Sequence, residues 1–359
     1  MLRGVACLMV VAFHYLTRGQ AAGWIQTSAP TGVDLVTRYG YLGVQLFFMI
    51  SGFVIFMSAQ GASPRAFMAS RGARLYPALW VAAPLTAAAA WWLQDERFQV
   101  SIPTLLVNLT LLPHWFNVEF VDGSYWSLAV EVQFYLMIAL TLQARLLGHI
   151  EKLLIGWLLL CAVDMVRPVY PLERWLAVSY APYFSAGICA YLIRERSANV
   201  PRIVLFGVSY VLALGDSLRS AIRVRSQEHI PLDDVWVLAT VTGFFALFVA
   251  IALGRRLVPA WRWTVWAGAL TYPVYLLHQN LGYMLIGMLE RWQWPLSGSV
   301  ILSAIAAAAG AWLIHRWVER PVGPWLRRRL IGMQSASGGQ RRRAAPERSQ
   351  SVVDGASSL

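Results

Sequence analysis

The chain has 359 residues, of which 58% are hydrophobic and 13% are charged, and its formal net charge is +12. A soluble globular protein carries roughly a quarter charged residues, so water is not the solvent for most of this surface. The arginines are spread over short polar segments and the C-terminal tail, which argues against a compact basic nucleic-acid-binding domain. Cys7, Cys161 and Cys189 lie in apolar blocks without disulfide or metal-ligand spacing, so they are predicted to be buried small side chains.

Apolar blocks recur along the chain, and a block of about 20 residues is long enough to cross a bilayer as a helix. The fold class predicted is therefore all-α, a polytopic integral membrane bundle of about ten transmembrane helices. The first block has a basic start like a signal peptide but no clear small-residue cleavage site, so it is predicted to be retained. The expected spans cover residues 3–20, 40–60, 75–93, 127–147, 153–166, 176–193, 203–214, 235–253, 266–289 and 298–316.

Arginine clusters give the expected orientation, because cytoplasmic loops carry an excess of Lys and Arg. With ten spans, all the clusters after even-numbered spans fall on one side, so both termini are expected to be cytoplasmic. These clusters are Arg65, Arg71 and Arg74; Arg145 and Lys152; Arg194, Arg196 and Arg202; Arg255, Arg256 and Arg262; and Arg327 to Arg329.

Two segments do not fit a simple alternation of spans and loops. Residues 215–234 carry Arg219, Arg223 and Arg225 and are interpreted as an external loop of mixed charge, with a misplaced seventh span as the alternative. Residues 104–118 are apolar but short and interrupted by proline, which predicts a re-entrant or interfacial helix.

The expected domain organisation is simple. Residues 1–330 are predicted to form one membrane domain. Residues 331–359 are rich in Ser, Gly, Arg and Gln and lack apolar periodicity, which predicts a disordered cytoplasmic tail.

Ionisable side chains inside the apolar blocks are the first candidates for chemistry. Arg3 and His14 lie eleven positions apart, which is close to three helical turns, so they share one helix face roughly 16 Å apart along the axis. Histidine titrates near neutral pH and suits a general base. The alternative is a neutral core histidine bonded to a neighbouring helix.

The fourth expected span contributes Ser127, Glu131 and Tyr135 on one helix face. A buried carboxylate is costly unless it is paired, protonated or facing water. We therefore expect Glu131 to pair with His14 and orient its imidazole, as in a catalytic dyad. A structural polar clamp between helices is the alternative.

Arg71 and Arg74 lie three apart at the expected cytoplasmic end of span three, so both can bind one phosphorylated ligand. Ordinary positive-inside anchoring is the alternative. In span two, Gln45 adds a polar group between glycines that favour close helix packing. In span nine, Tyr275 and His278 share a face and are possible pocket residues. His114, His149, His229 and His315 are assigned no role.

Five stretches in this order resemble the acyltransferase-3 family of membrane acyltransferases, from Leu2 to Pro321. They are LRGVACLMVVAFHY, GVQLFFMISGFVI, RGARLYPALW, YWSLAVEVQFYL, and LTYPVYLLHQNL followed by VERP. The resemblance implies transfer of an acetyl or other short acyl group from cytoplasmic acyl-CoA, most simply acetyl-CoA, to a hydroxyl of a carbohydrate, glycolipid or similar acceptor. It implies no permanently bound cofactor.

The resemblance also carries roles over to particular residues. His14 corresponds to the essential base or acyl acceptor, Arg3, Arg71 and Arg74 to donor-side arginines, and Glu131 to a polar partner near the reaction centre. Gln45 departs from the family, where an acidic residue is frequent, and Val132 replaces a frequent second Glu. Many relatives also carry a fused hydrolase-like domain, and here a short polar tail follows the last motif.

Two other function classes remain alternatives. A transporter or glycan flippase would use the same midplane polar residues as a substrate path, but it predicts inverted repeats that the sequence lacks. A membrane sensor or scaffold predicts a folded soluble domain. Abundant Arg beside a single Lys is typical of a GC-rich bacterial genome. The expected location is the bacterial inner (plasma) membrane.

Overall fold

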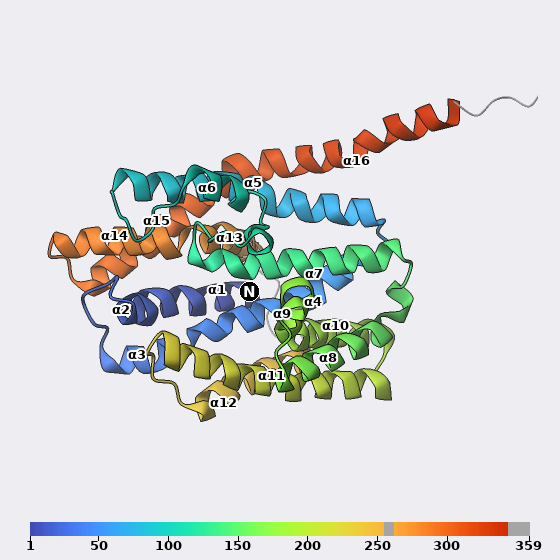
Figure 1. Cartoon of the computed structure of the whole chain (residues 1–359), viewed down its shortest axis with the longest axis horizontal. Coiled ribbons are helices and arrows are strands. Elements are labelled where there is room, and N and C mark those ends of the chain that lie inside the picture. The colour runs from blue at the N-terminus through green and yellow to red at the C-terminus, as the bar shows by residue number, and fades with distance from the viewer. Residues whose placement is uncertain (255–261, 344–359) are drawn as a thin grey trace, which may run out of the picture.

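The computed structural model describes residues 1–254 and 262–343, and this part of the chain contains helices and no strand. Most of the long helices run side by side as a bundle, and the last helix projects from one end of it (Figure 1). The α-helices are α1 (Leu2–Phe13), α2 (Gly19–Ala21), α3 (Thr31–Thr37), α4 (Gly43–Ala59), α5 (Pro64–Trp92), α6 (Ile102–Asn108), α7 (Trp126–Gln143), α8 (Ile150–Val166), α9 (Tyr170–Leu176), α10 (Ala181–Arg196), α11 (Val200–Gln227), α12 (Asp234–Ala252), α13 (Arg262–Leu277), α14 (Gln279–Arg291), α15 (Leu296–Ile314) and α16 (Arg320–Arg343).

The outer surface of the bundle is apolar, as a lipid-facing surface must be. Leu8, Trp92, Leu140 and Val166 are all exposed large hydrophobic side chains. By length and composition, 5 helical segments of the described chain can cross a membrane, or 6 if the pair bent by 66° around Ala177 counts as one span. The all-α membrane class is confirmed, whereas the expected count of about ten crossings stays a prediction.

The seventh expected span was misplaced, because α11 continues to Gln227 and contains most of the predicted external loop at 215–234. The charged residues that suggested a loop are stabilised on the helix by partners from elsewhere in the chain. Arg219 forms an ion pair with Asp164 at 3.8 Å, and Arg225 forms one with Asp234 at 2.6 Å. Helix α5 likewise starts well before residue 75, capped by the Ser63 side chain.

Other expected boundaries also differ from the observed ones. The ninth expected span, 266–289, is two helices, with His278 at the break between α13 and α14. Helix α16 crosses the expected domain boundary at residue 330. Arg255, Arg256 and the segment 344–359 of the expected tail lie outside the described residues. Residues 104–118 hold the short helix α6 and a 3-10 turn at Pro113–Phe116, not a full-length helix.

Helices α4 and α10 cross at two glycines near the centre of the bundle. A Cβ on Gly52 would lie 2.2 Å from the Phe184 carbonyl oxygen, and one on Gly187 would lie 2.1 Å from the Met49 carbonyl oxygen. Only glycine permits such a close approach of two helix backbones. This contact fixes α4, which carries side chains to both cavities described below.

Two π-helical turns interrupt the regular helices, at His14–Arg18 after α1 and at His315–Glu319 after α15. A π turn is rare and occurs frequently at functional sites. It shifts side chains out of the normal helical register. Each turn here contributes side chains to a cavity.

Candidate active site

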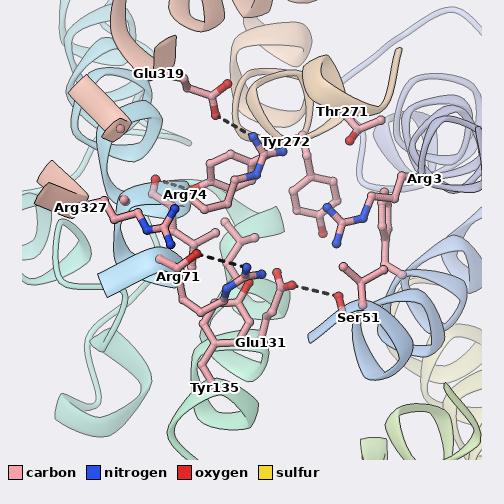
Figure 2. Close-up of a pocket in the computed structure, with 18 of the residues that line it drawn as sticks. Arg3, Ser51, Arg71, Arg74, Glu131, Tyr135, Thr271, Tyr272, Glu319 and Arg327 are labelled. Atoms are coloured by element: carbon pink, nitrogen blue, oxygen red, sulfur yellow. Dashed lines mark hydrogen bonds and ion pairs between the residues drawn. The ribbon is translucent and has the colours of Figure 1, made fainter. Parts of the chain in front are cut away.

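A large cavity of about 880 Å³ opens near the start of α1. Its wall comes from α1, α4, α5, α7, α13, the π turn after α15, and α16. The guanidinium groups of Arg3, Arg71, Arg74 and Arg327 and the Glu131 carboxylate lie around this space (Figure 2). The volume is sufficient for a ligand of cofactor size. We call it the arginine cavity.

Positive charge dominates the arginine cavity. The arginines that line it are Arg3, Arg71, Arg74, Arg320, Arg327 and Arg328, whereas its carboxylates are Glu131 and Glu319. Arg74 is partly neutralised by Glu319, with 3.4 Å between Nη1 and Oε1, and Glu319 also accepts from His315 Nδ1 at 2.7 Å. This surplus of guanidinium groups favours a ligand with several negative charges.

Arg71 forms no ion pair within 4 Å with the described residues. Its Nη2 donates to the Ser70 hydroxyl at 3.4 Å, which is a long bond to a neutral group. Its guanidinium carbon lies 5.9 Å from the Phe67 and Tyr135 ring centroids. Its Nε is buried and has no hydrogen-bond partner among the described residues. A buried donor without a partner is costly, so Arg71 is prepared for an anionic ligand.

Glu131 belongs to the arginine cavity, and the expected pairing with His14 is wrong. Glu131 Oε1 accepts from the Ser51 hydroxyl at 2.9 Å, and Tyr135 lies beside it one turn further along α7. Glu131 is only half-buried. Because the cavity is open and cationic, the carboxylate is stabilised there without a histidine partner.

A second, smaller cavity of about 300 Å³ lies toward the other end of α1. We call it the histidine cavity. Its polar lining combines His14 and Gln45 with charges near the end of α11. Arg18 and Glu228 form an ion pair at 3.2 Å, and Asp216 accepts from the Tyr183 hydroxyl at 3.0 Å. The lining further includes Ser124, Ser220, Arg223 and Gln227, and the aromatic rings of Phe13, Tyr41, Trp126 and Tyr180.

His14 meets a second histidine behind the wall of this cavity. His14 Nδ1 lies 2.9 Å from the Val10 carbonyl oxygen and 3.2 Å from His278 Nε2. The two rings are edge to face, with centroids 5.0 Å apart. His278 Nδ1 in turn lies 2.8 Å from the Tyr275 carbonyl oxygen. His278 is completely buried, whereas His14 lines the cavity.

Val44 and Tyr275 line both cavities and therefore form the partition between them. The Tyr275 hydroxyl lies 2.7 Å from the Ser127 hydroxyl and 3.2 Å from the Ser124 carbonyl oxygen. The Phe47 ring packs against the Tyr275 ring at 5.8 Å between centroids. Val44 and Tyr275 thus lie between the arginine cavity and the cavity that His14 lines.

The predicted site residues sort into two groups. Arg3, Arg71, Arg74, Ser127, Glu131 and Tyr135 line the arginine cavity, His14 and Gln45 line the histidine cavity, and Tyr275 lines both. His278 lies behind His14. Arg320, Arg327 and Arg328 were not among the predicted site residues, although Arg320 lies in the VERP motif. Asp216 was not among them either, because it was assigned to a loop. No cluster of His, Cys, Asp or Glu suited to a metal ion occurs in the described part of the chain.

Comparison with known proteins gives one match. The family model described as an acyltransferase domain, that of acyltransferase-3, matches residues 1–316. The match therefore covers the whole lining of the histidine cavity, and that of the arginine cavity except for Glu319 and the residues of α16. No curated protein and no solved structure matches the chain.

Proposed function

The chain belongs to the acyltransferase-3 family, and we propose that it moves an acetyl or other short acyl group from acyl-CoA to a hydroxyl of a carbohydrate, glycolipid or similar acceptor. The family match makes the protein a membrane acyltransferase. The observation that carries the finer proposal is the partition of Val44 and Tyr275, which brings a strongly cationic cavity next to a cavity lined by His14.

The arginine cavity suits the donor. Coenzyme A carries several phosphate charges, and guanidinium groups bind phosphate through paired, charge-assisted hydrogen bonds. Arg71 offers a buried Nε without a partner, and Arg3 and Arg327 lie around the same space (Figure 2). With the phosphates on these groups, the pantetheine arm would run along α1 and deliver the thioester to the partition.

The histidine cavity suits the acceptor. His14 lines this cavity, and its imidazole would take the proton from an acceptor hydroxyl. The hydroxyl oxygen then bonds to the acyl carbon as the carbon–sulfur bond breaks, and the proton passes on to the departing thiolate. In an alternative route the imidazole first takes the acyl group itself and then passes it to the hydroxyl.

We propose ten membrane crossings, made by α1, α4, α5, α7, α8, α9 with α10, α11, α12, α13 with α14, and α15. An even number of crossings returns the chain to the side on which it began. Arginines gather at the end near Arg3, so the positive-inside rule makes that end cytoplasmic, with both termini there. The proposed location is a bacterial inner membrane, with acyl-CoA reaching the arginine cavity from the cytoplasm.

A transporter or glycan flippase is the competing function, since it would use the same polar cavities as a path. The partition favours the acyltransferase, because Val44 and Tyr275 keep the two cavities separate in place of one continuous path. The two functions differ in whether a covalent product forms.

The test is transfer of radiolabel from acetyl-CoA to membrane glycans and glycolipids. Cells producing the native protein are compared with cells producing His14→Ala, and with His149→Ala as a matched control because His149 is exposed and lines neither cavity. We expect label in the native and His149→Ala cells and its loss in His14→Ala cells at equal abundance. Labelling that persists in His14→Ala, or its absence from all cells with other short acyl-CoAs also tried, would overturn the proposal.

A further inference from the structure

We propose that His278 is the positioning residue of the active site, because together with the Val10 carbonyl oxygen it holds the His14 imidazole in the tautomer whose reactive nitrogen is Nε2. This inference rests on the proposed acyl transfer and adds a second histidine to it. It depends on which of the four ring nitrogens carry hydrogen, and the neighbouring carbonyl groups decide this.

The tautomer of His278 follows from its contact with Tyr275. A carbonyl oxygen can only accept a hydrogen bond, so His278 Nδ1, 2.8 Å from the Tyr275 carbonyl oxygen, must carry the hydrogen. In the neutral ring the other nitrogen, Nε2, then has a lone pair and can only accept. His278 Nε2 thus presents an acceptor to His14.

The tautomer of His14 follows in the same way. His14 Nδ1 lies 2.9 Å from the Val10 carbonyl oxygen and 3.2 Å from His278 Nε2, and both of these atoms are acceptors. The Nδ1–H is therefore shared between them, and the neutral ring carries its lone pair on Nε2. Because the His14 ring lines the histidine cavity, Nε2 is the nitrogen available to an acceptor hydroxyl.

The backbone holds His278 firmly enough for this role. The residue lies at the break between α13 and α14, and its N–H donates to the Val274 carbonyl oxygen at 3.0 Å. Its own carbonyl oxygen accepts from the Tyr15 hydroxyl at 2.6 Å and from the Gly282 N–H at 3.2 Å. The side chain has no exposed surface, so it has no room to rotate away.

The chemical consequence is a directed proton transfer. When the acceptor hydroxyl attacks the thioester, its proton goes to His14 Nε2 and the ring becomes an imidazolium. The Nδ1–H remains bonded to Val10 and His278 throughout, so the ring keeps its orientation. The proton on Nε2 then goes to the departing thiolate, which restores the starting state. A third group that orients the base in this way is common to catalytic triads.

Two variants separate positioning from simple packing. His278→Leu removes the acceptor, whereas His278→Gln can keep an amide oxygen near the position of Nε2. We expect His278→Leu to lower kcat by about 100-fold or more, the range typical of a lost acid–base contribution, with KM for acetyl-CoA nearly unchanged. We expect kcat of His278→Gln to be at least about tenfold higher than kcat of His278→Leu. Equal kcat in His278→Leu and the native protein, or equal loss in both variants with intact acetyl-CoA binding, would overturn the proposal.

A measurement on the native protein tests the two tautomers even if a variant does not fold. In the protein labelled with ring ¹⁵N-histidine, the ¹⁵N shifts report which nitrogen of each ring carries hydrogen. We expect hydrogen on Nδ1 of both His14 and His278, and hydrogen on Nε2 of His14 in the neutral ring would refute the inference. The shifts require no turnover, so this result is independent of whether acyl transfer itself is detected.

Discussion

The Tyr275 hydroxyl lies 2.7 Å from the Ser127 hydroxyl, and this bond links α13 to α7 at the partition between the two cavities. Neither residue is charged, and both are buried. The tyrosine ring covers the short path between the donor and acceptor sides of the proposed active site. Its hydroxyl holds the ring in that place.

Removing the Tyr275 hydroxyl is expected to let water pass the partition. In Tyr275→Phe the ring stays but its bonds to Ser127 and Ser124 are lost, so water reaches the thioester more easily. We expect acyl-CoA hydrolysis without acceptor to rise several-fold relative to transfer. Both rates are measured on purified protein, with Tyr210→Phe as the control because that residue loses a similar 2.9 Å bond to Thr242 away from the cavities. An unchanged ratio of hydrolysis to transfer would rule out this role.

Arg71 is expected to bind the donor. A charge-assisted hydrogen bond contributes about 1.5–3 kcal/mol, so Arg71→Gln should raise KM for acetyl-CoA by roughly tenfold to a hundredfold. The matched control is Arg196→Gln, which removes an exposed arginine that donates to Gln60 at 3.1 Å outside the arginine cavity. Initial rates over a range of acetyl-CoA concentrations give KM for each variant. A KM equal to that of the control would place the phosphates elsewhere.

Glu131 provides a test of the pairing that the sequence suggested and the structure does not contain. Glu131→Gln keeps an acceptor for the Ser51 hydroxyl but removes a negative charge from a cavity that binds an anion. We expect KM for acetyl-CoA to fall slightly, since repulsion of the phosphates is reduced, and kcat to change by less than about tenfold. A dyad with His14 would instead lower kcat by about 10²–10⁴. Steady-state kinetics of this one variant distinguish the two roles.

The glycine contact between α4 and α10 is expected to control stability. A methyl group at Gly187 would meet the Met49 carbonyl oxygen at 2.1 Å, and a backbone atom cannot move aside without shifting a helix. Gly187→Ala should therefore destabilise the protein by about 1–3 kcal/mol. Thermal unfolding in detergent measures the effect. Gly207→Ala on α11 is the control, because a Cβ there meets nothing within 4 Å, and its Tm should stay level or rise.

Some features of the fold were predictable because they depend on local sequence. Hydropathy gave the membrane class and the places of most long helices, since a bilayer demands long apolar helices from any chain that crosses it. The boundaries of α11 were not predictable, because Arg219 is stabilised by Asp164 on another helix. A sequence pattern reports a charge, but only the tertiary structure provides its partner.

The same division holds for the candidate site. Helical period and charge determined by themselves that Arg3, His14, Arg71 and Glu131 were candidates for chemistry, because few ionisable groups occur inside membrane helices without a function. Which of them meet was decided by the packing of helices that are distant in sequence. His14 and His278 are 264 positions apart and lie at 3.2 Å, whereas Glu131 pairs with Ser51. Contacts of this kind depend on helix crossings, which no local pattern encodes.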